Sequence, residues 1–105
     1  MKLDGGFSVA TGHPAFAGHF PGRPIVPGVV LLSEVLEAVL ADVELAALVG
    51  RAPRLGVVKF LAPVGPGAAL DLRFEPTATS LRFEVTHAGR PVASGHFERV
   101  VPNAA

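Results

Sequence analysis

Residues 13–30 of this 105-residue chain read His-Pro-Ala-Phe-Ala-Gly-His-Phe-Pro-Gly-Arg-Pro-Ile-Val-Pro-Gly-Val-Val. Proline fixes the backbone angle φ and removes an amide donor, and it also disfavours helix in the residue before it. A stretch this rich in proline therefore predicts a stiff, non-helical loop. Such stiffness is suited to holding one side chain still, and His19 is the best candidate for that side chain.

A helical pattern begins immediately after this loop and extends from Val29 to about Val49. Pro27 and Gly28 stand at its start, and Gly50 stands at its end as a natural C-cap. At about 100° per residue, one broad apolar face is expected to be buried. That face contains Leu32, Val35, Leu36, Val39, Leu40 and Val43, whereas Glu34, Glu37, Ala41 and Glu44 lie on the other side.

The period of the pattern changes to two after Pro53, which predicts strands. The apolar run Leu55 to Leu61 indicates a strand buried on both faces, and two alternating segments near residues 70–75 and 81–85 indicate half-buried strands. Phe7 to Thr11 and Val92 to Val101 are expected to be further strands. One long helix followed by antiparallel strands predicts a single α+β domain over residues 1–105, with a sheet wrapped around the helix.

The composition narrows the classes of function. Half of the residues are apolar and mean hydropathy is +0.47, which favours an oligomer that covers part of this surface. Nine basic residues balance nine acidic ones, so no nucleic-acid footprint is present. The chain has no cysteine, which excludes disulfides and thiol chemistry, and His87 and His96 have no acidic residues at metal-ligand spacing. The N-terminus lacks a signal-peptide core and no apolar run is long enough to span a membrane, so a cytoplasmic location is expected.

The segment from Gly18 to Val29 resembles the active-site loop of the hot-dog-fold 3-hydroxyacyl-[acyl-carrier-protein] dehydratases, whose signature is roughly Gly-His-Phe-Pro-Gly-x-Pro-x-x-Pro-Gly-Val. The resemblance continues in Val58-Lys59-Phe60, in residues 63–67 and in Ala93-Ser94-Gly95. It implies a hot-dog fold, dehydration of 3-hydroxyacyl thioesters, an acyl carrier protein as partner, and a homodimer or trimer of dimers. It implies neither a metal nor a redox cofactor.

Dehydration of a 3-hydroxyacyl thioester needs a base for the C2 proton, an acid for the departing hydroxyl and a donor to the thioester oxygen. His19 suits the base, because imidazole titrates near neutral pH, and the resemblance places the family's catalytic histidine there. Gly28 suits the donor, because the first turn of a helix has free N–H groups with partial positive charge. The alternatives are a histidine that only orders the loop and a glycine that only makes a turn.

This chain differs from the family at the position of the acid. The resemblance places its carboxylate fourteen residues after the histidine, where this chain has Ser33. Glu34 is rotated by about 100° from that position, whereas Glu37 lies one turn along on nearly the same face. We hypothesise that Ser33 and Glu37 together replace the usual acid through a proton relay. The alternative is that Glu37 is an ordinary solvated residue.

Other residues have weaker assignments. Phe16 and Phe20 are candidate walls of an acyl tunnel, and Pro27, Val29 and Glu34 are candidate substrate contacts. His13 borders the loop, and Arg23, Arg51 and Arg54 are candidate contacts for an acidic carrier protein. Two other functions stay open: a hot-dog thioesterase that uses Glu34 or Glu37, and a non-catalytic acyl-binding subunit whose partner supplies the carboxylate missing at Ser33.

Overall fold

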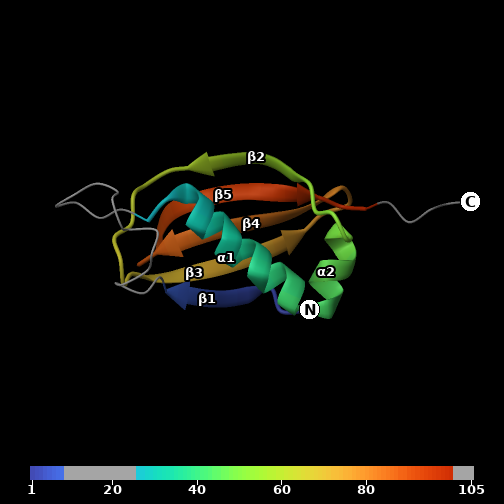
Figure 1. Cartoon of the computed structure of the whole chain (residues 1–105), viewed down its shortest axis with the longest axis horizontal. Coiled ribbons are helices and arrows are strands. Elements are labelled where there is room, and N and C mark those ends of the chain that lie inside the picture. Colours follow the sequence, from blue (N-terminus) through green and yellow to red (C-terminus); the bar gives the residue numbers. More distant parts are fainter. Residues whose placement is uncertain (9–25, 101–105) are drawn as a thin grey trace, which may run out of the picture.

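The computed structural model describes residues 1–8 and 26–100, and it places a long helix across one face of a five-stranded antiparallel sheet (Figure 1). The strands follow the order β1-β3-β4-β5-β2 across the sheet, so β1 and β2 form its two edges. This arrangement confirms the predicted α+β architecture. The elements are β1 (Asp4–Ser8), α1 (Gly28–Ala41), α2 (Val43–Val49), β2 (Leu55–Phe60), β3 (Ala69–Pro76), β4 (Ser80–His87) and β5 (Arg90–Glu98).

The two central strands have the alternation that the sequence predicted. Buried and exposed residues alternate along β3 and β4, and the two strands pair with Leu72 opposite Val85 and Phe74 opposite Phe83. Since side chains point alternately to the two faces of a sheet, one face is apolar and covered while the other carries the charges. Helix α1 packs on the covered face of the sheet.

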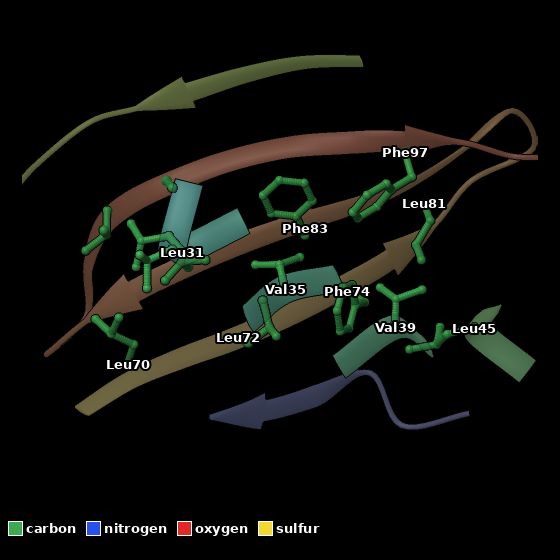
Figure 2. Close-up of a cluster of buried hydrophobic side chains, with 14 of the residues drawn as sticks. Leu31, Val35, Val39, Leu45, Leu70, Leu72, Phe74, Leu81, Phe83 and Phe97 are labelled. Atoms are coloured by element: carbon green, nitrogen blue, oxygen red, sulfur yellow. The ribbon is translucent and has the colours of Figure 1, made fainter. Parts of the chain in front are cut away.

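The hydrophobic core lies between α1 and the covered face of the sheet (Figure 2). Val35 and Val39 of α1 have no exposed surface, and they meet side chains of β3, β4 and β5. The rings of Phe83 and Phe97 lie 5.5 Å apart between centroids, tilted by 42°, which is a favourable aromatic arrangement. The core fixes the position of α1 on the sheet, and with it the position of Gly28.

The helical region consists of two helices, and the expectation of one continuous helix to Val49 is wrong. Asp42 has an extended backbone, and its carboxylate accepts hydrogen bonds from the amides of Glu44 and Leu45, so it caps a new helix. Because the chain turns there, Val43 is 85% exposed rather than part of a buried face. Gly50 ends α2 with a φ of 78°, which confirms its predicted role as a C-cap.

Strand β2 is an exposed edge, so the expectation of a strand buried on both faces is wrong. It pairs with β5 on one side only. Val57 is 68% exposed, and Leu55, Phe60 and Leu61 are exposed as well. Apolar composition predicted burial, but among the described residues only Gly56 and Val58 of this strand are partly covered.

The remaining strand boundaries differ from the expectations by a few residues. The first strand begins at Asp4 rather than Phe7, and its expected end at Thr11 lies outside the described residues. The last strand spans Arg90–Glu98 rather than extending further toward Val101. Within the described part of the chain, no helix is both long and apolar enough to cross a membrane.

Candidate functional site

The start of α1 is the centre of the candidate site. Pro27 has an extended backbone, and its carbonyl oxygen accepts the amides of Val30 at 2.9 Å and Leu31 at 3.4 Å, which begins the helix at Gly28. Within residues 1–8 and 26–100, no acceptor is bonded to the Gly28 N–H. The amide therefore has the position and the partial charge that suit binding of an oxyanion.

An apolar hollow opens beside this amide. It has a volume of about 590 Å³ and no charged residue among its described lining. Phe60, at the end of β2, forms one wall with its ring directed at Gly28. The size is that of a small-molecule site, and the walls suit a hydrocarbon chain. The lining residues are Val26, Gly28, Val29, Leu31, Phe60, Leu61, Ala62 and Pro63.

Two flanks of α1 differ in chemistry. We call the apolar one the β2-facing flank; at 100° per residue it consists of Val29, Leu32, Leu36 and Leu40. Val29 is 69% exposed and Leu40 is 53% exposed, whereas Leu32 and Leu36 are half-buried against the core. Val29 lies beside Phe60 in the hollow at the helix start, which identifies the side of the sheet that this flank faces.

We call the opposite one the β1-facing flank; it consists of Glu34, Glu37, Ala38 and Ala41. These residues line a second hollow of about 420 Å³ together with Lys2, Asp4 and the two glycines of β1. Gly5 lies opposite Leu72 on the helix side of the sheet, and because it has no side chain, β1 leaves space next to the helix there. The two carboxylates therefore face a partly polar groove, separate from the apolar hollow at Gly28.

Ser33 lies on the exposed side of α1 between the two flanks. Its hydroxyl donates a hydrogen bond to the carbonyl oxygen of Val29 at 2.9 Å, so its proton is directed back into its own helix. Glu37 lies one turn further along, also exposed, and it is about 13 Å from Gly28 along the helix axis. The structure thus brings Ser33 near Glu37, and places Glu34 and Glu37 together, but it does not bring either glutamate into the hollow that Gly28 lines.

Several predicted site residues lie outside the described part of the chain. These are His13, Phe16, His19, Phe20 and Arg23. Their assigned roles stay predictions.

Arg51 and Arg54 are described, and both are exposed. They precede β2 at the end opposite Phe60, about 20 Å along the strand from the Gly28 hollow (Figure 1). Within one copy of the chain, the predicted carrier-protein contacts at these two arginines are therefore remote from the site.

Within the described residues, no group of His, Asp or Glu side chains is arranged to hold a metal ion. His96 instead lies on the outer face of the sheet over Gly56, where a Cβ atom would collide with its Nε2.

Phe60 is the residue that sequence reasoning missed. The only signal for it was its place in Val58-Lys59-Phe60, a segment that the resemblance contained without assigning it a role.

Known proteins share the family and the fold of this chain. The family model described as ApeI-like, ApeI dehydratase, matches residues 2–97. A 3-hydroxyacyl-[acyl-carrier-protein] dehydratase FabZ of Symbiobacterium thermophilum is 37% identical over 75 residues, covering 68% of this chain and 53% of that protein. The chain spans about half to three-fifths of the length of the curated relatives that it matches.

Solved structures share the fold. The dehydratase heterocomplex ApeI:P from Xenorhabdus doucetiae has a TM-score of 0.71 at 20% identity, covering 96% of this chain and 90% of that one. The fluoroacetyl-CoA thioesterase FlK has a TM-score of 0.57 at 17% identity, covering 95% of this chain and 87% of that one. These similarities confirm the predicted hot-dog fold, and the family match over residues 2–97 is to dehydratases. The chain belongs to the ApeI-like dehydratase family.

Proposed function

We propose that this protein reversibly dehydrates 3-hydroxyacyl thioesters to trans-2-enoyl thioesters, with the acyl group carried on an acyl carrier protein. The observation that carries the proposal is that Gly28, whose amide begins α1, lines an apolar hollow of about 590 Å³. A donor at a helix start supports negative charge on the thioester oxygen, and apolar walls support the hydrocarbon chain.

In the proposed reaction the His19 imidazole removes a proton from C2. The electrons of that C–H bond pass through an enolate, whose oxygen the Gly28 N–H stabilises, and then form the C2–C3 double bond. The C3–O bond breaks, and the hydroxyl leaves as water after it receives a proton. His19 lies nine residues before Gly28 in the family's loop motif, and this spacing supports the pairing of the two groups.

The leaving hydroxyl also needs a proton. We keep the relay hypothesis, in which Glu37 supplies the proton through Ser33 or a water molecule. Both residues are exposed and one turn apart on α1, which supports transfer between them. The hydrogen bond from Ser33 to Val29 must break before the hydroxyl can take part.

We also propose that the working form is a dimer in which the β2-facing flank of α1 and the edge strand β2 meet a second copy. An unpaired edge beside exposed apolar side chains is a surface that soluble proteins normally cover. Val29, Leu40, Phe60 and Leu61 supply that surface, each more than half exposed. In such a dimer Ser33 of one copy borders the hollow of the other, so each site draws on two copies.

The proposal is tested by incubating the protein with 3-hydroxyacyl and 2-enoyl thioesters while both interconversion and free thiol are measured. We expect interconversion without thiol release, and His19→Ala is expected to lower the rate by about 10²- to 10⁴-fold, the usual contribution of a general base. Release of free thiol would instead support the alternative function, a thioesterase in which Glu34 or Glu37 acts in hydrolysis.

A second candidate function is a non-catalytic or partly catalytic subunit paired with a related dehydratase. The observation that favours it is Ser33 at the position of the family carboxylate. The solved ApeI:P complex is a heterocomplex, which supports pairing of this kind. If the protein alone shows neither interconversion nor thiol release, and a related full-length dehydratase restores interconversion, this second function replaces the first.

A further inference from the structure

The ring of Phe60 occupies the space where a side chain at position 28 would lie. An ideal Cβ atom built on Gly28 would lie 2.6, 2.8 and 3.0 Å from the Cζ, Cε1 and Cε2 atoms of the Phe60 ring. Gly28 is not among the glycines with positive φ, so its backbone makes no demand for glycine. A side chain at position 28 would require the Phe60 ring to move, because the far end of that ring occupies the space beside the Gly28 Cα atom.

The backbone around this contact is held from several directions. The Val26 amide donates to the Val64 carbonyl at 2.8 Å, which ties the segment before α1 to the segment after β2. The amides of Leu61 and Ala62 both donate to the Val92 carbonyl, at 2.8 and 3.3 Å, and Phe60 itself pairs with Ala93 of β5. The ring therefore forms a wall whose backbone cannot withdraw without breaking the sheet.

We propose that Phe60 is the residue that restricts the substrate to acyl groups unbranched at C2, an inference that rests on the proposed dehydratase function. A carbonyl oxygen bound to the Gly28 N–H lies about 2.9 Å from the nitrogen. The adjacent C2 atom then lies within a few ångströms of the Gly28 Cα atom, and the tip of the ring stands beside the position that a Cβ atom of Gly28 would take. A methyl branch on C2 directed at Phe60 would collide with the ring.

The restriction follows from steric exclusion rather than from a missing polar contact. The hollow contains no charged group among its described lining, so selection inside it must depend on shape. One methyl group in an apolar pocket typically changes kcat/KM by about 10- to 200-fold. We therefore expect the wild-type protein to prefer crotonyl over 2-methylcrotonyl N-acetylcysteamine thioester by about 50-fold in kcat/KM for hydration.

The experiment compares kcat/KM for these two thioesters in the wild type, Phe60→Leu, Phe60→Ala and Val57→Ala. Val57 is the matched control, because it lies on the same strand, is similarly exposed, and lines a hollow on the other face of the sheet. We expect the preference for the unbranched substrate to fall about tenfold in Phe60→Ala and less in Phe60→Leu. Val57→Ala should keep the wild-type preference.

Phe60 also belongs to the proposed dimer surface, so each variant is checked by light scattering and circular dichroism. The ratio of two substrates on one preparation is unaffected by how much of that preparation is active. An unchanged ratio in both Phe60 variants, or equal use of both substrates by the wild type, would overturn the inference.

A binding measurement tests the role of Phe60 separately from the proposed reaction. Butyramide and 2-methylbutyramide N-acetylcysteamine analogues are titrated against the same four proteins by calorimetry. If the wild type binds selectively but turns over neither thioester, and Phe60→Ala loses the binding selectivity, the Phe60 assignment stands and the dehydratase function fails. If turnover is present but both analogues bind every variant equally, the Phe60 assignment fails and the function stands.

Discussion

The two flanks of α1 have the same backbone and opposite chemistry. The β1-facing flank has two glutamates over a groove that Gly5 leaves open, whereas the β2-facing flank has only apolar side chains beside an unpaired edge strand. Within one copy of the chain, each flank is exposed. The comparison teaches that exposed charged side chains are ordinary for a surface in water, while exposed Val29 and Leu40 form an apolar surface of the kind that proteins normally cover.

The largest difference is expected between two variants, each of which places a carboxylate on one flank of α1. Leu40→Glu places a carboxylate in the proposed dimer surface, and Ala41→Glu places the same group one residue away on the β1-facing flank. Since an unpaired buried charge is strongly unfavourable, we expect Leu40→Glu to weaken the dimer at least about 100-fold and to lower turnover in proportion at micromolar protein. Analytical ultracentrifugation and the hydration assay measure the two effects.

Ala41→Glu is the control for helix propensity and for charge near the end of α1. It should leave both the dimer and the turnover nearly unchanged. Equal effects of the two substitutions would show that the flanks do not differ, and would remove the argument for this dimer surface.

The buried side of the same helix provides the next comparison. Val35 has no exposed surface, whereas Val29 is 69% exposed in a single copy. Val35→Ala should lower the free energy of unfolding by about 2 kcal/mol, because it removes buried methyl groups and leaves a cavity. Val29→Ala should change the unfolding of the monomer by less than about 0.5 kcal/mol. Urea unfolding in the Leu40→Glu background separates this from any loss of the dimer.

The relay hypothesis predicts a smaller and more specific effect on the polar side of the helix. Glu37→Gln should lower turnover about tenfold, since it removes the proton source, while Glu34→Gln on the same flank should lower it less than about twofold. Ser33→Glu, which restores a carboxylate at the family's position, should raise turnover and make it insensitive to Glu37→Gln. Full turnover in Glu37→Gln, together with loss of turnover in His19→Ala, would contradict the relay.

A feature of the fold or of the candidate site was predictable from the sequence where it depends on residues that are close together in the chain. The alternation along β3 and β4 is local, because each side chain's face follows from its neighbours, and it was predicted correctly. The helix break was missed because apolar periodicity continues past Asp42, although an aspartate three residues before Leu45 is a typical N-cap.

Strand β2 was misjudged for a different reason. A run of apolar residues indicates that a surface will be covered, but not by which copy of the chain. The contact between Phe60 and Gly28 joins residues 32 positions apart, and no local pattern predicts it. The loop motif indicated His19 and Gly28 only because a family shares it, and the place of His19 lies outside the described residues.

The smallest expected effect concerns the end of α1. Asp42 accepts hydrogen bonds from the amides of Lys2 and Leu45, and these hold the pKa of its carboxyl below the usual value. A carboxyl with a lowered folded-state pKa adds stability that is complete above the unfolded-state pKa of about 3.9 and is lost as the pH falls through the folded-state value. Asp42→Asn keeps a cap without the charge, so its stability should fall less between pH 6 and pH 3. Thermal unfolding at several pH values measures the difference, and parallel curves for the two proteins would contradict it.

The most direct measurement is specific activity on a 2-enoyl thioester as the protein is diluted, with the dimer fraction followed on the same samples. We predict that hydration to the 3-hydroxyacyl thioester falls in parallel with the dimer fraction, and that the monomeric Leu40→Glu protein has almost none. Full hydration activity in a monomer would contradict the claim that the apolar flank of a second copy completes the site.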